Sequence, residues 1–164
     1  MIESVTDKAR AARQASYDLA ALPADAKNQA LLAMAAALEG RLDEISAANR
    51  RDIGAGEAKG LTGAMLDRLL LTPERIALLA SNLRDVAALD DPAGKEISAW
   101  TASNGMKMSR VRTPIGIIGI VYEARPNVTA DCAGLCVKAG NAVILRGGSE
   151  AIHSNRAIHR VMAR

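Results

Sequence analysis

The sequence has no phenylalanine, one tryptophan and two tyrosines among its 164 residues. An aromatic core is therefore excluded, and burial has to come from alanine, leucine, isoleucine, valine and methionine. Hydrophobic residues make up 49% of the chain and charged residues 24%, which is the balance of one ordinary globular domain. Because alanine and leucine head the scale of helix propensity, this composition favours helices.

The chain also lacks a long basic run, an apolar stretch of about 18 residues and the pattern of a signal peptide. Its net charge of +3 comes from 21 basic and 18 acidic residues. These are interspersed, and the longest basic run is the pair Arg50-Arg51, so nucleic-acid binding is not expected. Glu3, Asp7 and Lys8 interrupt any apolar segment at the N-terminus. We expect a cytoplasmic protein without a membrane partner.

Cysteine and histidine are scarce, with two of each. Cys132 and Cys136 lie four residues apart on the apolar face of a predicted helix, where a mutual disulfide is poorly directed. They fit a reducing compartment, and we expect them to pack as small hydrophobic side chains. His153 and His159 are six residues apart and so fall on different helix faces. No metal site is expected.

Helical periodicity dominates the first ninety residues. Apolar residues recur at helical spacing from about Ser4 to Ala20, and again from about Pro23 to Asn49. Gly54, Gly56 and Gly60 then break the pattern. A further helix is predicted to begin at Thr72–Glu74, which offers a cap, a proline at the first helical position and a carboxylate in the first turn. It should end before Asp90.

The period then changes to an extended one. Ile97–Ala102 and Met106–Arg112 flank Ser103-Asn104-Gly105, and an Asn-Gly pair between two such runs is a strong hairpin signal. Ile115–Tyr122 is a continuous isoleucine and valine run, as expected of a strand buried on both faces of a parallel sheet.

A helix should follow this strand. Arg125-Pro126 suits a helix start, and Gly140-Asn141 suits a left-handed stop. Ala142–Leu145 is predicted to be a second strand, which makes the segment a βαβ unit with a further helix after it.

Arg146–Glu150 is the first candidate site, because a glycine turn between a strand and a helix presents backbone N–H groups to an anion. Arg146 adds a permanent charge and a forked set of donors suited to phosphate. No established phosphate-loop pattern is present. A tight connection with a solvated Arg146 therefore remains the alternative interpretation.

Tyr122–Asn127 is the second candidate site, because open α/β sheets place ligands at the carboxyl ends of their strands. Glu123, Arg125 and Asn127 are candidates for contacts with a substrate. In the alternative interpretation, Asn127 caps a helix while Glu123 and Arg125 form an ion pair. Asp67-Arg68, flanked by apolar residues, is expected to pair on the surface or between helices, although it could also reach a ligand.

Several phrases together resemble the gamma-glutamyl phosphate reductase family of the aldehyde dehydrogenase superfamily. The resemblance runs from about Gln14 to the last residue. The phrases that carry it are Ala48-Asn49, Gly60-Leu61, Ala64–Leu69, Leu71–Ile76, Asp91-Pro92, Pro114–Gly116, Tyr122–Asn127 and Gly140–Gly148.

The resemblance implies an α/β fold, part of the aldehyde dehydrogenase fold. Residues 1–95 would be a helical N-terminal portion, 96–112 a hairpin of the oligomerisation type, and 113–164 the first part of an NADP-binding Rossmann-like unit. The implied reaction is the NADPH-dependent reduction of L-glutamyl 5-phosphate to L-glutamate 5-semialdehyde and phosphate in proline biosynthesis. The implied partners are this small-molecule substrate, glutamate 5-kinase and further copies of the chain.

The resemblance also assigns roles to residues. Asn127 is the candidate oxyanion stabiliser, although Arg125 could take that place, and Glu123 and Arg125 are candidates for substrate binding. The family's nucleophilic cysteine lies downstream and matches neither cysteine of this chain, so the chain alone is expected to be inactive. An uncharged Ser149 beside Arg146 would suit the 2′-phosphate of NADPH, which gives the expected cofactor-binding set Arg146, Gly147, Gly148 and Ser149.

Two other interpretations remain open. The chain could be a non-catalytic helical interaction module or a truncated remnant, or it could come from another acyl-phosphate or aldehyde dehydrogenase of the superfamily. The hairpin around Asn104-Gly105 resembles the element through which superfamily subunits associate. Its edge would lack a partner strand, so we expect self-association.

Overall fold

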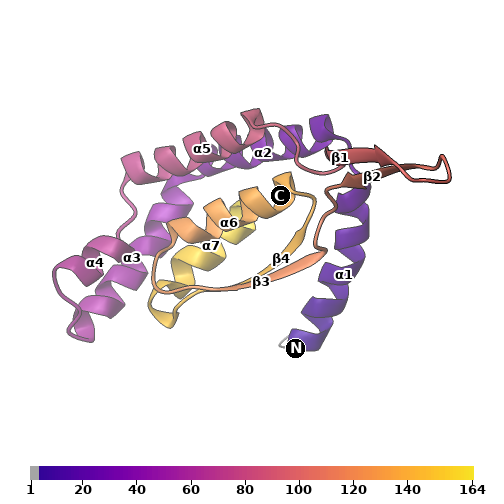
Figure 1. The fold of residues 1–164 in the computed structure, drawn as a ribbon. Coiled ribbons are helices and arrows are strands. Elements are labelled where there is room, and N and C mark those ends of the chain that lie inside the picture. Colours follow the sequence, from indigo (N-terminus) through magenta and orange to yellow (C-terminus); the bar gives the residue numbers. More distant parts are fainter. Residues whose placement is uncertain (1–3) are drawn as a thin grey trace.

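The computed structural model describes residues 4–164, which form a mixed α/β structure of helices and two small sheets (Figure 1). The elements, in chain order, are α1 (Val5–Ala21), α2 (Ala24–Gly40), α3 (Leu42–Ala58), α4 (Ala64–Leu69), α5 (Pro73–Ala88), β1 (Glu96–Thr101), β2 (Lys107–Val111), β3 (Ile117–Val121), α6 (Asn127–Lys138), β4 (Ala142–Arg146), the short 3-10 helix η1 (Ser149–Ala151) and α7 (Ile152–Met162).

Two helix starts follow directly from local sequence. The Ser4 hydroxyl accepts a hydrogen bond from the backbone amide of Asp7, and the Asp7 carboxylate accepts one from the amide of Ser4, which together form a capping box. The Thr72 hydroxyl caps α5 in the same way by accepting from the amide of Arg75. The predicted start of α5 is therefore confirmed, and the helix ends at Ala88, before Asp90, as expected.

The prediction of one helix from Pro23 to Asn49 is wrong. The chain leaves the helical conformation at Arg41, where φ is −124° and ψ is 28°, so that α2 ends at Gly40 and α3 begins at Leu42. Apolar periodicity continues across this point because both helices turn leucine and isoleucine side chains toward the same core. A short turn between them therefore leaves no mark in the hydrophobic pattern.

The predicted break at Gly54 and Gly56 is also wrong, because α3 continues to Ala58 and ends before Gly60. A Cβ atom added at Gly56 would lie 3.1 Å from Leu61 Cδ1 and 3.3 Å from Leu66 Cδ2. The missing side chain thus lets α4, which the sequence analysis did not anticipate, pack closely against α3.

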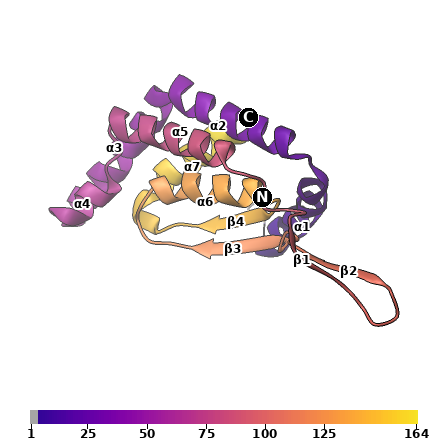
Figure 2. The same cartoon turned by 45° about the horizontal axis from the view of Figure 1, so that its top comes forward.

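The core lies between layers of helices. Helices α2 and α5 run side by side over α6 and α7, and α6 lies against the β3–β4 sheet, which α1 also contacts (Figures 1 and 2). The buried hydrophobic side chains are almost all leucine, isoleucine, valine and alanine, as the composition predicts. One core cluster of them consists of Leu31, Ala35, Leu38, Ile45, Leu71, Ile76, Leu79, Ala80, Leu83, Ala87, Ala130, Ile158 and Val161.

The predicted hairpin is confirmed. Strands β1 and β2 pair antiparallel, with a register irregularity between Glu96 and Ser98. Gly105 adopts a φ of 83° in the turn, which its lack of a side chain permits. All residues of both strands are exposed, and the ribbon projects away from the helices (Figure 2). The hairpin therefore contributes little to the core.

The βαβ unit is confirmed as well. Strands β3 and β4 are parallel, with Ile117 opposite Ala142 and Val121 opposite Arg146, and α6 connects them. Gly140, with φ of 73°, ends α6 as predicted. The expectation that the first strand is buried on both faces is wrong, because every residue of β3 is at least partly exposed. Within residues 4–164 this sheet has only two strands, so each strand has one edge without a partner strand.

Candidate functional site

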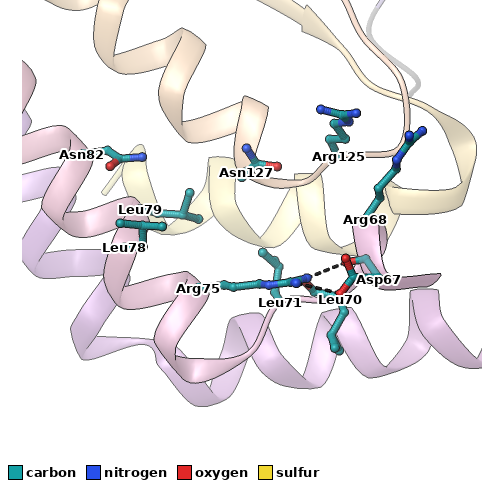
Figure 3. Close-up of a pocket in the computed structure, with 10 residues that line it drawn as sticks. All are labelled: Asp67, Arg68, Leu70, Leu71, Arg75, Leu78, Leu79, Asn82, Arg125 and Asn127. Atoms are coloured by element: carbon teal, nitrogen blue, oxygen red, sulfur yellow. Dashed lines mark hydrogen bonds and ion pairs between the residues drawn. The ribbon is translucent and has the colours of Figure 1, made fainter. Parts of the chain in front are cut away.

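A cleft of about 340 Å³ opens at the carboxyl end of β3, between α4, α5 and the start of α6 (Figure 3). It brings Arg125 together with Arg68 and Arg75, which come from a distant part of the chain, and it also contains two asparagines and several leucines. The residues that line it are Asp67, Arg68, Leu70, Leu71, Arg75, Leu78, Leu79, Asn82, Arg125 and Asn127.

Arg75 is fully engaged by the protein. Its Nη2 atom lies 2.7 Å from the Asp67 carboxylate, while Nη1 donates to the carbonyls of Asp67 at 2.5 Å and Leu70 at 3.0 Å (Figure 3). The expected interhelical pairing of Asp67 is thereby confirmed, with α5 as the partner. Arg75 fixes the end of α4 to the start of α5, and its charge is largely balanced by Asp67.

Arg68 and Arg125 are held far more loosely. Arg68 Nη1 lies 3.8 Å from Glu123 Oε2, and Arg125 Nε lies 3.6 Å from Glu123 Oε1. The predicted ion pair of Glu123 and Arg125 is therefore present. Neither separation is within hydrogen-bonding distance, and all three side chains are about half exposed or more. Both guanidinium groups can reorient toward a ligand.

Asn127 occupies the first turn of α6, and the prediction that it caps the helix is wrong, because Pro126 stands at the cap position. Its Nδ2 atom donates to the Asp131 carboxylate at 3.3 Å, and Asn82 of α5 donates to the same carboxylate at 3.2 Å. A carboxylate only accepts, so both amide groups must turn their nitrogen atoms toward Asp131. One N–H of Asn127 remains for another acceptor.

The Arg146–Ser149 turn is packed tightly. A Cβ atom at Gly147 would lie 2.2 Å from the Asn155 side chain and 3.0 Å from the Tyr122 ring. One at Gly148 would lie 3.1 Å from the Ala124 amide nitrogen. Both glycines are thus required for the turn to approach the Tyr122–Asn127 loop, and the two candidate sites share one wall.

Some polar groups of this turn face solvent, and others form hydrogen bonds within the protein. The Arg146 side chain is exposed. Hydrogen bonds from its own backbone amide and from the Ser149 hydroxyl lower the pKa of Glu150, and the charges of Lys59 and Arg146 lower it further. Glu150 is therefore a carboxylate held against the turn by the turn's own donors.

The strand-to-helix pattern suggested that the amides at the start of α7 are available to an anion. They are not, because a side chain of the protein already accepts from them. The Asp52 carboxylate of α3 accepts from the amides of His153 at 3.1 Å and Ser154 at 2.7 Å, and from the Ser154 hydroxyl at 2.6 Å. The protein thus supplies its own anion to this helix terminus. Of the side-chain donors of the predicted phosphate site, Arg146 is exposed, whereas the Ser149 hydroxyl donates to Glu150 at 3.2 Å.

Known proteins match almost the whole chain. The gamma-glutamyl phosphate reductase of Moorella thermoacetica is 58% identical over 160 residues, which cover 98% of this chain and 38% of the relative. The chain belongs to the gamma-glutamyl phosphate reductase family. It spans little more than a third of the length of the curated gamma-glutamyl phosphate reductases that it matches. No protein-family model matches it.

Solved structures agree with this assignment. The crystal structure of gamma-glutamyl phosphate reductase from Thermotoga maritima superposes with a TM-score of 0.93 at 39% identity, over 96% of this chain and 38% of that one. A probable aldehyde dehydrogenase from Listeria monocytogenes superposes with a TM-score of 0.61 at 15% identity, over 93% of this chain and 32% of that one. The second comparison shows a shared fold, and the predicted fold class is confirmed.

The surroundings of the two cysteines in α6 do not favour a reactive thiolate. Cys136 is buried, Cys132 is partly buried, and both are free thiols. Burial is the main reason why the pKa of each thiol is raised; the charge of Asp131 adds to this at Cys132, and Cys132 adds to it at Cys136. A raised pKa keeps sulfur protonated and weakly nucleophilic. Their expected role as small core side chains therefore fits their surroundings.

Within residues 4–164, no group of three or more histidine, cysteine, aspartate or glutamate residues is arranged to hold a metal ion. None of the helices in this part of the chain has the length and apolarity needed to cross a membrane.

Part of the cleft could be predicted from the sequence. Glu123, Arg125 and Asn127 directly follow a strand, and the charge of Arg68 is flanked by apolar residues. Arg75 and Asn82 carried no local signal. They enter the cleft because α5 crosses beside the start of α6, and a single sequence does not reveal such a contact.

Proposed function

We propose that this chain is part of a cytoplasmic enzyme that uses NADPH to reduce L-glutamyl 5-phosphate to L-glutamate 5-semialdehyde and phosphate, in proline biosynthesis. The observation that carries the proposal is the cleft at the end of β3. In a member of this family it gathers Arg68, Arg125 and the amide of Asn127 around one volume. Glutamate 5-kinase is the pathway partner that the proposal implies.

Asn127 is proposed to stabilise the oxyanion that forms when a nucleophile attacks the acyl carbonyl. Its Nδ2 atom retains one N–H besides that given to Asp131, and an amide N–H aimed at a developing negative charge is a suitable donor. We place the nucleophilic cysteine outside residues 1–164, because the pKa values of both thiols in this chain are raised. The chain alone is then inactive.

The Arg146–Ser149 turn is proposed to hold the phosphate-bearing end of NADPH. The exposed guanidinium of Arg146 supplies donors that suit a 2′-phosphate, the Ser149 hydroxyl could turn to it from Glu150, its present acceptor, and Gly147 and Gly148 keep the turn against the Tyr122–Asn127 loop. When bound, the cofactor would supply the hydride. The residues of this chain would orient it at the wall that the turn shares with the cleft.

Expression of the chain together with the coding sequence that follows codon 164 tests this function. The expected product shows phosphate-dependent formation of NADPH from NADP and glutamate 5-semialdehyde, which is the reaction in reverse. Asn127→Ala should lower kcat about 10²–10³-fold, the usual cost of losing one oxyanion donor. The measurement is the absorbance of NADPH over time.

Asn82→Ala is the matched control, because Asn82 is also an amide that donates to Asp131 in this cleft. It should keep kcat near the wild-type value. Equal losses in both variants would contradict the role of Asn127. A stop codon directly after codon 164 would instead support a remnant or an interaction module.

The exposed hairpin, residues 96–112, is proposed to be the oligomerisation element between the helical portion 1–95 and the cofactor-binding portion 113–164. Its strands carry Ile97, Trp100 and Met108, which are 54%, 48% and 39% exposed, and its edges lack partner strands. Light scattering of the purified chain should show mass rising with concentration. Trp100→Lys should reduce this rise, whereas a wild-type chain that stays monomeric at high concentration would refute the proposal.

A further inference from the structure

The polar end of the cleft contains two arginines that share one carboxylate. Arg68, from α4, and Arg125, from the loop before α6, project to the same side of the cleft (Figure 3). Glu123 approaches both, at 3.8 Å from Arg68 and 3.6 Å from Arg125. One carboxylate therefore stands between two cations that come from distant parts of the chain.

Glu123 holds Arg68 and Arg125 less tightly than the neighbouring Arg75 is held by its own partners. Arg75 has three partners at hydrogen-bonding distance, whereas the contacts of Glu123 with Arg68 and Arg125 are longer than a hydrogen bond. Glu123 is also 68% exposed. Long, solvated ion pairs of this kind contribute little to stability and can be exchanged for others.

The charges indicate what would replace Glu123. Asp67 is matched by Arg75, so the remaining pair of guanidinium groups carries two positive charges against the single charge of Glu123. A dianion would balance both, and a guanidinium group binds phosphate oxygens through two parallel hydrogen bonds. A carboxylate would leave one positive charge unmatched.

We propose that Arg68 and Arg125 bind the dianionic phosphoryl group of an acyl phosphate, and that Glu123 occupies this place until the ligand displaces it. The inference rests on the proposed function and identifies which part of the substrate the arginines hold. In an acyl phosphate the phosphoryl group adjoins the reacting carbonyl. A phosphoryl group on Arg125 therefore puts the carbonyl toward Asn127, two residues along the chain and in the same cleft.

The test is a titration of the 164-residue chain, labelled with nitrogen-15, with inorganic phosphate at constant ionic strength. The Nε–H signals of Arg68 and Arg125 should shift together and saturate. Arg68→Gln should weaken phosphate binding about tenfold, as expected for the loss of a charge-assisted, bidentate contact. Glu123→Gln should tighten it, by about threefold to tenfold, because the competing carboxylate is removed.

Arg10→Gln is the matched control. Arg10 lies in α1, away from the cleft, and its contact with Asp7 is also 3.8 Å long, so the variant makes the same change in charge and removes a similar pair. It should leave phosphate binding unchanged. Equal weakening of phosphate binding by Arg68→Gln and Arg10→Gln would show that net charge alone causes the effect, and would contradict the proposed phosphate site. Unchanged or weaker phosphate binding in Glu123→Gln would contradict the proposal that the ligand displaces Glu123.

A parallel titration with glutamate separates the two kinds of anion on the substrate. If glutamate shifts the Arg68 and Arg125 signals and phosphate does not, the arginines form a carboxylate site and the assignment to the phosphoryl group is wrong. The titrations involve neither cofactor nor turnover. A failure of hydride transfer in the enzyme assay and a failure of phosphate binding are therefore separate results.

Discussion

Asp91→Asn is expected to destabilise the folded chain by about 3–5 kcal/mol, the usual cost of leaving one member of a buried ion pair alone. The Nζ atom of Lys27 lies 2.5 Å from Asp91 Oδ2, and the Lys27 side chain is only 2% exposed. Without the carboxylate, the buried Lys27 side chain would lose its ion-pair partner. Urea denaturation at pH 7 measures the change in the free energy of unfolding.

Asp90→Asn is the control. Asp90 is the adjacent residue and also pairs with a lysine, Lys95, at 2.7 Å, but its side chain is 87% exposed. Little change in stability is expected, because solvent screens such a pair. Lys27→Met in the Asp91→Asn background should recover part of the loss, since it removes the unpaired charge. Equal effects of the Asp90 and Asp91 variants would show that burial of the pair contributes nothing.

The same ion pair predicts a dependence on pH. Burial acts to raise the pKa of Asp91, but hydrogen bonds from Lys27 and from the amide of Ala93 outweigh it, so that the pKa lies below its ordinary value. The stabilisation is therefore complete above the ordinary aspartate pKa, about 3.9, and is lost as the pH falls through the lower pKa of the folded state. The stability difference between wild type and Asp91→Asn should shrink below about pH 4.

Local sequence predicted the elements whose ends are fixed locally. Thr72 and Pro73 begin α5, Gly105 forms the hairpin turn, and Gly140 ends α6, and each effect acts within a few residues. The break at Arg41 was missed because the helical period of apolar residues continues across it. Helix α4 was missed because its formation depends on packing against Gly56 of α3 rather than on a cap or a long amphipathic stripe.

In the candidate site, too, the sequence predicts positions that are fixed locally and misses those that depend on packing. Glu123, Arg125 and Asn127 follow β3 directly, so their place at its carboxyl end could be predicted. The approach of Arg68 to Glu123 depends on how α4 is held, and that is decided by a buried asparagine. Asn49 of α3 donates to the carbonyl of Leu69 at 2.8 Å and accepts from the amide of Leu71 at 2.9 Å. Such contacts span about twenty residues and leave no periodic signal in the sequence.

Asp52→Ala is the second change expected to have a large effect, about 3–5 kcal/mol of lost stability, because each hydrogen bond to a charged group contributes about 1.5–3 kcal/mol. The Asp52 residue is 2% exposed, and its carboxylate accepts three hydrogen bonds from the start of α7, although about a hundred residues separate it from Ser154. Alanine would leave the amides of His153 and Ser154 and the Ser154 hydroxyl without this acceptor. Buried polar groups without partners are costly, and hydrogen bonds to a charged group are among the stronger ones.

Two comparisons isolate this helix-capping role of Asp52. Asp43→Ala removes an exposed carboxylate from the same helix, α3, and should change stability only slightly. Ser154→Ala keeps both amide hydrogen bonds to Asp52 but removes the two of the hydroxyl, which donates to Asp52 and accepts from Asn49, and should cost about 2–3 kcal/mol. Hydrogen exchange gives a local measurement, because in Asp52→Ala the amides of His153 and Ser154 should exchange faster than those of the last turn of α6. Unchanged protection of these two amides would show that α7 does not need the carboxylate supplied by α3.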